Sequence, residues 1–208
     1  MPRGVRGPSP PPRRGRRLGW REVEFASLDF ETTGLDHRRD AVVSFGVVPV
    51  RGGRVQVGEA VHQLVFPTVP ASASSMKIHH LLPQDLSGAP PLEEARETLR
   101  AALEGRFVLA WYAEVEVAFL RRIFGGGRRT WRRRTVDARR LAIELEGARP
   151  DVRNTLAATA ARYGIPVSSP HEALEDALVT AQLFLVLATK LEARGSRPVR
   201  SLLRLTRA

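Results

Sequence analysis

Hydrophobic and polar positions along the chain follow two different periods. Alternating or short apolar runs rich in β-branched and aromatic residues predict β-strands at residues 23–30, 41–50, 55–66, 107–111 and 135–136. The pair Gly52-Gly53 between the second and third strands is typical of a hairpin turn. Apolar positions recurring every three or four residues predict helices at residues 75–82, 92–103, 113–124, 138–146, 154–163 and 172–192, with Asp137 capping the fourth. Strands followed by alternating helices and strands indicate an α/β fold, a mixed sheet flanked by helices.

Composition narrows the class of protein. The chain has 208 residues and a net charge of +11, which suits a single folded domain with an anionic partner. The absence of cysteine excludes disulfides, thiolate zinc sites and a cysteine nucleophile. No apolar run is long enough to span a membrane, and no apolar stretch follows the basic N-terminus as in a secretory signal. We therefore expect a cytoplasmic protein without membrane contact.

The positive charge is concentrated in two segments. Residues 1–19 contain six arginines and no acid, and their Pro, Gly and Arg content predicts a disordered tail. Such a tail either contacts phosphates or is merely a solvated leader. In residues 121–140, nine arginines surround the Gly125–Gly127 loop and Trp131. We favour nucleic-acid contact there, with Trp131 stacking on a base, over a solvated charge run with Trp131 packed inward.

Two acids share one face of the first predicted strand. Because side chains alternate along a strand, Asp29 and Glu31 project from the same face, roughly 6–7 Å apart. Two neighbouring carboxylates repel each other, and a divalent cation with a preference for oxygen ligands, such as Mg²⁺ or Mn²⁺, resolves that repulsion. The alternative is a pair of solvated acids at an exposed strand end.

Two further acids lie within the apolar stripes of predicted helices. Glu116 shares a helical face with Phe119 and neighbouring apolar residues, and Asp176 shares one with Phe184. Glu116 could instead sit at the edge of its stripe, in contact with water or arginine. His171 stands at the start of the last predicted helix, five residues before Asp176. One centre gathering the four acids would bind two divalent cations, with neutral His171 accepting a proton from the attacking water.

The residues in this order resemble the DEDDh 3′–5′ exonuclease family, which includes the epsilon subunit of bacterial DNA polymerase III, ribonuclease T and oligoribonuclease. The first motif, LDFETTGL at residues 28–35, and the third, HEALEDA at residues 171–177, match that family closely. Ile78-His79 also resembles a family stretch, although His80 stands where glycine is usual. The second motif departs, because Trp111 and Tyr112 replace a polar pair and Glu116 replaces aspartate.

This resemblance implies an RNase H-like exonuclease fold with a five-stranded mixed sheet, which we assign to residues 20–208. It implies hydrolysis of the terminal phosphodiester at the 3′ end of single-stranded nucleic acid, with DNA favoured, releasing 5′-mononucleotides. Asp29, Glu31 and Asp176 would hold the tighter of two Mg²⁺ or Mn²⁺ ions, Glu116 would serve the second, and His171 would be the general base. Substrate contacts are expected from Thr32, Thr33, Gly34, Leu35, His79, Trp111 and Tyr112.

Two other functions remain open at this point. The altered second motif could leave a nucleic-acid-binding module without catalysis. The chain could also be a small-substrate phosphodiesterase that acts on oligoribonucleotides or modified nucleotides. The expected partners are 3′ ends of single-stranded DNA or RNA, with a polymerase or repair complex as a further candidate. The sequence does not separate DNA from RNA, proofreading from repair or RNA processing, or one oligomeric state from another.

Overall fold

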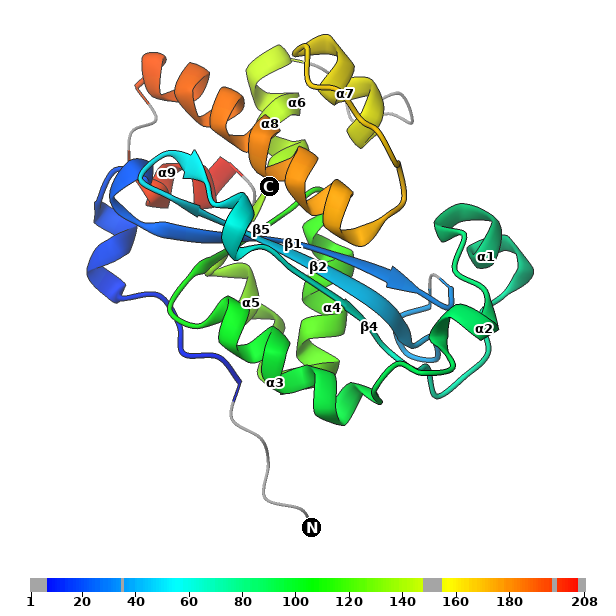
Figure 1. Ribbon diagram of the computed structural model, residues 1–208. Coiled ribbons are helices and arrows are strands. Elements are labelled where there is room, and N and C mark those ends of the chain that lie inside the picture. The colour runs from blue at the N-terminus through cyan, green and yellow to red at the C-terminus, as the bar shows by residue number, and fades with distance from the viewer. Residues whose placement is uncertain (1–6, 35, 148–154, 196–197, 206–208) are drawn as a thin grey trace.

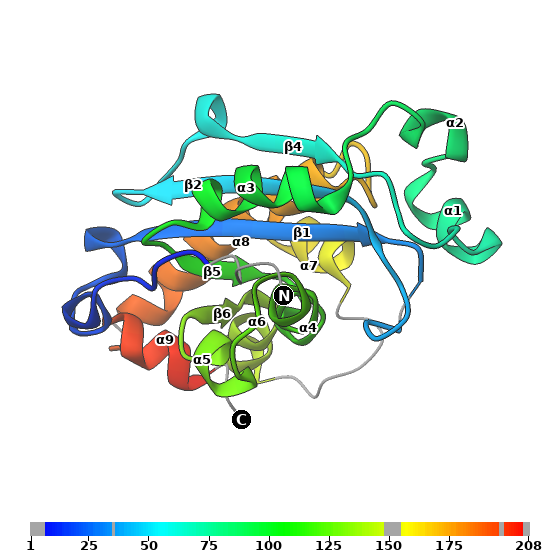
Figure 2. The same cartoon turned by 90° about the horizontal axis from the view of Figure 1, so that it is seen from below.

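The computed structural model describes residues 7–34, 36–147, 155–195 and 198–205. Within these ranges the strands form one mixed sheet with the order β3-β2-β1-β5-β6, and β4 also pairs with β2. Their bounds are β1 Glu24–Thr32, β2 Val42–Arg51, β3 Arg54–Val55, β4 Val61–Leu64, β5 Phe107–Ala110 and β6 Thr135–Asp137. β1 is antiparallel to β2 and parallel to β5, which is parallel to β6. The predicted α/β fold with a mixed sheet is confirmed (Figures 1 and 2).

The sheet has six strands rather than five because one edge strand is interrupted. The predicted strand at residues 55–66 is divided into β3 and β4 by a 3₁₀ turn, η3, at Val57–Glu59. β3 pairs with Val50 and Arg51 of β2, and β4 pairs with residues 44–47 of the same strand. The two short strands therefore share one edge position. The hairpin predicted at Gly52 and Gly53 joins β2 to β3, and both glycines have positive φ.

The helices cover both faces of the sheet (Figure 1). Their bounds are α1 Ala73–His79, α2 Pro83–Leu86, α3 Leu92–Leu103, α4 Ala113–Phe124, α5 Arg128–Arg132, α6 Ala138–Glu146, α7 Leu156–Arg162, α8 Ala173–Ala193 and α9 Val199–Leu205. The sequence predicted α3 and α4 with the observed bounds, and Asp137 caps α6 as predicted. It did not predict α2, α5 or α9, which are only four, five and seven residues long. None of the described helices is both long and apolar enough to cross a bilayer.

Alternation along β1 separates two hydrophobic clusters. Phe25 packs with α8, where its ring lies 4.7 Å from that of Phe184. Leu28 and Phe30 point to the opposite face and pack with residues of α3 and α4. Because alternate side chains share a face, Asp29 lies on the same side as Phe25, facing α8. The sheet therefore directs the acidic pair of β1 toward α8.

The N-terminal segment packs against the domain, which differs from the expected disordered tail. The backbone carbonyl of Pro8 accepts a hydrogen bond of 3.0 Å from the buried guanidinium of Arg134. The Ser9 backbone N–H donates to Glu104, and its carbonyl accepts from Gly105. Residues 13–17 form a 3₁₀ helix, η1 (Arg13–Arg17), which contacts α9. Composition favoured disorder, but tertiary hydrogen bonds hold residues 7–19; residues 1–6 lie outside the described residues.

Candidate active site

Three carboxylates meet at the carboxyl end of β1. Asp29 and Glu31 come from β1 and Asp176 from the first turn of α8. One oxygen of each lies within 4.8 Å of those of the other two, and all three side chains are partly buried. Carboxylate oxygens at this separation are a suitable ligand set for Mg²⁺ or Mn²⁺. The structure thus brings together three of the four predicted acids as one group.

A glycine on the neighbouring strand allows α8 to approach β1. Gly46 of β2 is directly opposite Asp29 in the antiparallel register. A Cβ at Gly46 would lie 2.2 Å from the carbonyl oxygen of Ala173, the first residue of α8. No side chain fits in that space, so only glycine lets the helix start close enough for Asp176 to reach the acids of β1. The sequence did not indicate a role for Gly46, since nothing local distinguishes it from other glycines in strands.

Glu116 completes the acidic region from the first turn of α4. Its side chain is 5% exposed, as its place in the apolar stripe predicted. Its Oε2 atom is buried and has no hydrogen-bond partner among the described residues. It lies outside the group of three but is close enough to raise the pKa of Asp29. A buried carboxylate oxygen without a partner is costly, which suits a cation ligand.

Burial and mutual repulsion raise the pKa values of these acids. Burial, and then the charge of Asp176, raises the pKa of Glu31 to about 8. Burial also raises the pKa of Glu116 to about 8, with smaller contributions from Asp137 and Glu31. The pKa of Asp29 is raised by burial and by the charges of Glu116, Glu31 and Asp176. The arrangement favours either protonation or a bound cation, so a divalent metal fits this group.

Asp137 is a fifth acid of the region whose wider role the sequence did not reveal. Its side chain accepts a hydrogen bond of 3.1 Å from the Arg140 backbone N–H, which is the predicted cap of α6. It also accepts one of 3.2 Å from the Ala113 backbone N–H at the start of α4. Asp137 therefore anchors the turn of α4 that presents Glu116. Burial raises its pKa to about 6.

His171 precedes α8 in the position that the sequence predicted. Its side chain is exposed, and its backbone has a φ of 67°, an unusual conformation for a residue other than glycine. The His171 backbone N–H donates to Asp176 Oδ2 at 3.2 Å. The charge of His171 also opposes the burial-driven rise in the pKa of Asp176. Strained backbone of this kind is frequent at functional sites.

The turn after β1 is held by its own threonines. Thr33 Oγ1 donates to Asp40 at 3.0 Å and accepts from the Ala41 backbone N–H at 2.9 Å. Thr32 Oγ1 donates to the Gly34 carbonyl at 2.7 Å. These hydroxyls stabilise the turn, which leaves its backbone as the expected contact to a nucleotide. Leu35, predicted to pack on the nucleotide, lies outside the described residues.

The remaining predicted substrate residues have different environments. His79 is buried, its Nδ1 accepts from the Leu81 backbone N–H at 3.0 Å, and its buried Nε2 has no partner among the described residues. His80 has a φ of 59°, which explains why glycine suits this position. Trp111 packs partly against the hydrophobic core, whereas Tyr112 is 49% exposed. The guanidinium of Arg139 lies 5.2 Å from the Tyr112 ring centroid.

Trp131 does not stack on a ligand, so that interpretation of the sequence was wrong. Its side chain is only 4% exposed, packs beside Phe124, and donates from Nε1 to the Gly125 carbonyl at 2.9 Å. Arg134 is buried as well, and it donates to the carbonyls of Pro8, Leu103 and Arg106. The arginine-rich segment thus divides into buried structural residues and exposed ones.

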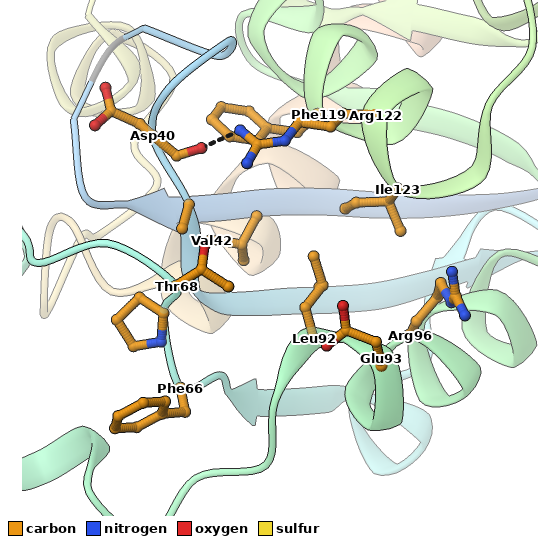
Figure 3. A pocket seen from close by; sticks show the side chains of 12 residues that line it. Asp40, Val42, Phe66, Thr68, Leu92, Glu93, Arg96, Phe119, Arg122 and Ile123 are labelled. Atoms are coloured by element: carbon orange, nitrogen blue, oxygen red, sulfur yellow. Dashed lines mark hydrogen bonds between the residues drawn. The ribbon is translucent and has the colours of Figure 1, made fainter.

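A separate pocket of about 210 Å³ lies on the opposite face of the sheet (Figure 3). Val42, Leu92, Phe119 and Ile123 contribute apolar walls, and Arg122 donates a hydrogen bond to the Asp40 carbonyl. None of the four acids lines it. The candidate active site is therefore the acidic group and not this pocket.

Sites that hold two divalent metals occur in phosphatases, polymerases, nucleases and aminopeptidases, so the acidic group is compatible with a nuclease. The family model described as Exonuclease (RNase_T) matches residues 27–184. The chain therefore belongs to this exonuclease family, as the resemblance to DEDDh exonucleases implied.

Two relatives of similar sequence are named as DNA polymerase III proteins. The DNA polymerase III PolC-type of Thermotoga maritima is 32% identical over 168 residues, which are 79% of this chain. A DNA polymerase III subunit epsilon-like protein of Rhodobacter capsulatus is 31% identical over 180 residues, which are 84% of this chain. The chain spans only 12% and 25% of the lengths of these two curated relatives.

Solved structures confirm the RNase H-like fold. Escherichia coli Exonuclease I in complex with a dT13 oligonucleotide has a TM-score of 0.71 at 16% identity, covering 83% of this chain and 42% of that one. The nuclease domain of 3′hExo, a DEDDh family member bound to rAMP, has a TM-score of 0.67 at 12% identity, covering 83% and 94%.

Proposed function

We propose that this chain is a metal-dependent 3′–5′ exonuclease that releases 5′-mononucleotides from single-stranded nucleic acid, with DNA as the favoured polymer. The observation that carries this proposal is the convergence of Asp29, Glu31 and Asp176, with ligand oxygens within 4.8 Å of one another. Glu116 supports it, since its buried Oε2 has no partner among the described residues. Repulsion between these acids destabilises the site until a cation binds.

Each acid has a distinct place in the proposed ligand set. Asp29, Glu31 and Asp176 would hold one Mg²⁺ or Mn²⁺ ion, and Asp29 together with Glu116 would hold a second. Bound divalent cations stabilise charge on a phosphoryl group in displacement and lower the pKa of a water molecule. Asp137, by anchoring the start of α4, keeps Glu116 directed at the acidic group.

His171 is the proposed general base. Its exposed imidazole can accept a proton from the attacking water, which is the most common role of histidine in general acid-base catalysis. The hydrogen bond from its backbone N–H to Asp176 fixes its position relative to the acids. The terminal nucleotide would lie along the backbone of Thr32, Thr33 and Gly34, with His79, Trp111 and Tyr112 bordering it.

The relatives support DNA as substrate. Both are named as DNA polymerase III proteins, and the Exonuclease I structure holds a deoxythymidine oligonucleotide. We propose a proofreading or repair role in the cytoplasm, with a polymerase or repair complex as partner. The shared segment is a small part of those relatives, so the partner is a proposal for this chain and not a property carried over.

A degradation time course tests the activity. Single-stranded DNA and RNA of equal sequence, each labelled at the 5′ end, are incubated with Mg²⁺, Mn²⁺ or EDTA. We expect a ladder that shortens from the 3′ end, requires metal and is absent with the Asp29→Ala protein. The faster polymer identifies the substrate. Equal cleavage in EDTA, or by Asp29→Ala, would contradict the proposal.

Two other outcomes point to the competing functions. Binding of both strands without shortening in any metal would support a nucleic-acid-binding module whose site was disabled by the altered second motif. Cleavage restricted to RNA fragments of a few nucleotides would support an oligoribonucleotide phosphodiesterase.

A further inference from the structure

We propose that an arginine surface beside the candidate active site binds the phosphate backbone of the substrate strand behind its 3′ end. We define the arginine surface as Arg128, Arg129, Arg132, Arg133 and Arg140. This inference rests on the proposed function, because it concerns where the nucleotides upstream of the hydrolysed 3′ end bind. It assigns to this chain a preference for strands long enough to reach α5.

Two adjacent hollows form the surface. One is lined by Arg128, Arg129, Arg132 and Arg133. The other is lined by Arg128, Arg132 and Arg140 together with residues of α4 and β6. Arg128 and Arg132 line both hollows, so the two hollows are adjacent. α5 packs against α4, which lies next to it in Figure 2.

The second hollow lies beside the start of α4, the helix that carries Glu116, although none of the four acids lines the hollow. Its lining includes Ala113 and Asp137, which are joined by the hydrogen bond at the start of α4. Ala113 precedes Glu116 by three residues, or about 4.5 Å along the helix axis. The neighbouring Tyr112 is half-exposed, and the guanidinium of Arg139 lies over its ring. In the proposed path, a strand leaving the acids would pass Tyr112 first and the arginines next.

The charges of this region fit a phosphodiester backbone. Arg129 and Arg133 are exposed, and they lie four residues apart, about 6 Å along a helix. Among the residues that line the two hollows, the acids are Glu114, which pairs with Arg128, and the buried Asp137. Arginine forks bind phosphates, and an exposed tyrosine stacks on any base, so binding would be strong without being sequence-specific.

Glu114 forms an ion pair with Arg128 and therefore competes with a phosphate group for this arginine. Both side chains are more than half exposed, and exposed ion pairs contribute little stability. A phosphate can therefore replace Glu114 as the partner of Arg128. Removing the Glu114 charge is expected to strengthen strand binding, the opposite of what removing an arginine does.

The test compares two charge reversals in the full chain. Arg129→Glu/Arg133→Glu changes the proposed surface, and Arg54→Glu/Arg200→Glu changes exposed residues of β3 and α9 by the same net charge. Binding of a dT strand of about 20 nucleotides, longer than the ~4–16 that one small domain covers, is measured in EDTA at several salt concentrations. We expect Kd to rise about tenfold for the first variant. The slope of log Kd against log salt concentration should fall by about 1.4.

Activity on a short substrate separates this proposal from the proposed function. The first variant should hydrolyse a nitrophenyl ester of thymidine 5′-monophosphate at the wild-type rate, while its KM for the long strand rises. Glu114→Gln should lower Kd for the long strand two- to threefold, roughly the effect of one weak exposed ion pair. An equal rise in Kd for both reversals, or no rise in either, would overturn the arginine surface. A wild-type protein that binds through these arginines but hydrolyses nothing would leave it standing and reject the exonuclease.

Discussion

The two ends of the central strand β1 differ in whether their charged side chains have partners of opposite charge. At the amino end of β1, Glu24 pairs with Arg106 at 3.0 Å, and the nearby buried Arg134 donates to three backbone carbonyls. At the carboxyl end, Asp29 and Glu31 have no basic partner among the described residues, and their neighbours are further acids. The charged side chains at the amino end bind partners within the protein and stabilise the fold. The acids at the carboxyl end have no such partners, so they are available to bind a ligand.

Removing an acid should therefore abolish activity while stabilising the metal-free protein. Asp29→Asn keeps the shape of the side chain but removes a charge that three other acids repel. We expect hydrolysis to fall about a thousandfold, equivalent to about 4 kcal/mol of transition-state stabilisation. The Tm measured in EDTA should rise. An unchanged rate, or a lower Tm in EDTA, would contradict the comparison between the two ends.

Removing the buried guanidinium should have the opposite effect on stability. Arg134→Met leaves three carbonyls, those of Pro8, Leu103 and Arg106, without their donor. We expect the free energy of unfolding to fall by about 3 kcal/mol in urea denaturation. The matched control is the exposed neighbour Arg133→Met, which should change stability by less than about 0.5 kcal/mol. Equal effects of the two variants would mean that Arg134 is not structural.

Placing a methyl group between β2 and α8 should disturb the acidic end alone. Gly46→Ala forces the first turn of α8 away, because the new Cβ would lie 2.2 Å from the Ala173 carbonyl oxygen. We expect a loss of about 2 kcal/mol in stability and a weaker affinity for Mn²⁺, since Asp176 moves with the helix. Gly58→Ala is the control, because nothing lies within 4 Å of its Cβ position. Isothermal titration with Mn²⁺ that finds wild-type affinity in Gly46→Ala would contradict this role.

The pH dependence of stability should distinguish metal-free from metal-bound protein. Folding raises the pKa values of Glu31 and Glu116 to about 8, so the folded state binds more protons than the unfolded state between their ordinary pKa of 4.5 and 8. Stability in EDTA should therefore decline as the pH rises from about 5 to 8. The increase in Tm on adding Mg²⁺ should grow over the same interval. Glu31→Gln should flatten the decline, and a decline as steep as wild type in that variant would contradict the assignment.

The spacing of apolar residues correctly predicted the amphipathic helices. The predicted bounds of residues 92–103 and 113–124 are those of α3 and α4, because one apolar stripe in each packs on the sheet. The same reasoning identified Glu116 as an acid inside such a stripe, and the structure buries it. The third predicted strand was too long, since nothing in its pattern marks the 3₁₀ turn that divides it.

Composition was a weaker guide to the arginine-rich segments. Residues 7–19 were expected to be disordered, and Trp131 was expected to contact nucleic acid. Both are packed in the fold, because Arg134 uses the Pro8 carbonyl and Trp131 uses the Gly125 carbonyl as hydrogen-bond acceptors. Arg134 and Pro8 are 126 positions apart, so no window of sequence contains their contact. Trp131 and Gly125 are only six positions apart, but composition alone does not show that the chain turns back to join them.

The sequence by itself determined the α/β class, the family and the identity of the acids, because these depend on periodicity and on motifs within a few residues. Only the tertiary structure decided which charges are partnered. It packed α8 against Gly46 so that Asp176 meets Asp29 and Glu31, and it buried Arg134 while leaving Arg129 exposed. The reason is that Coulomb energy and desolvation depend on distance and burial, and the folded chain sets both.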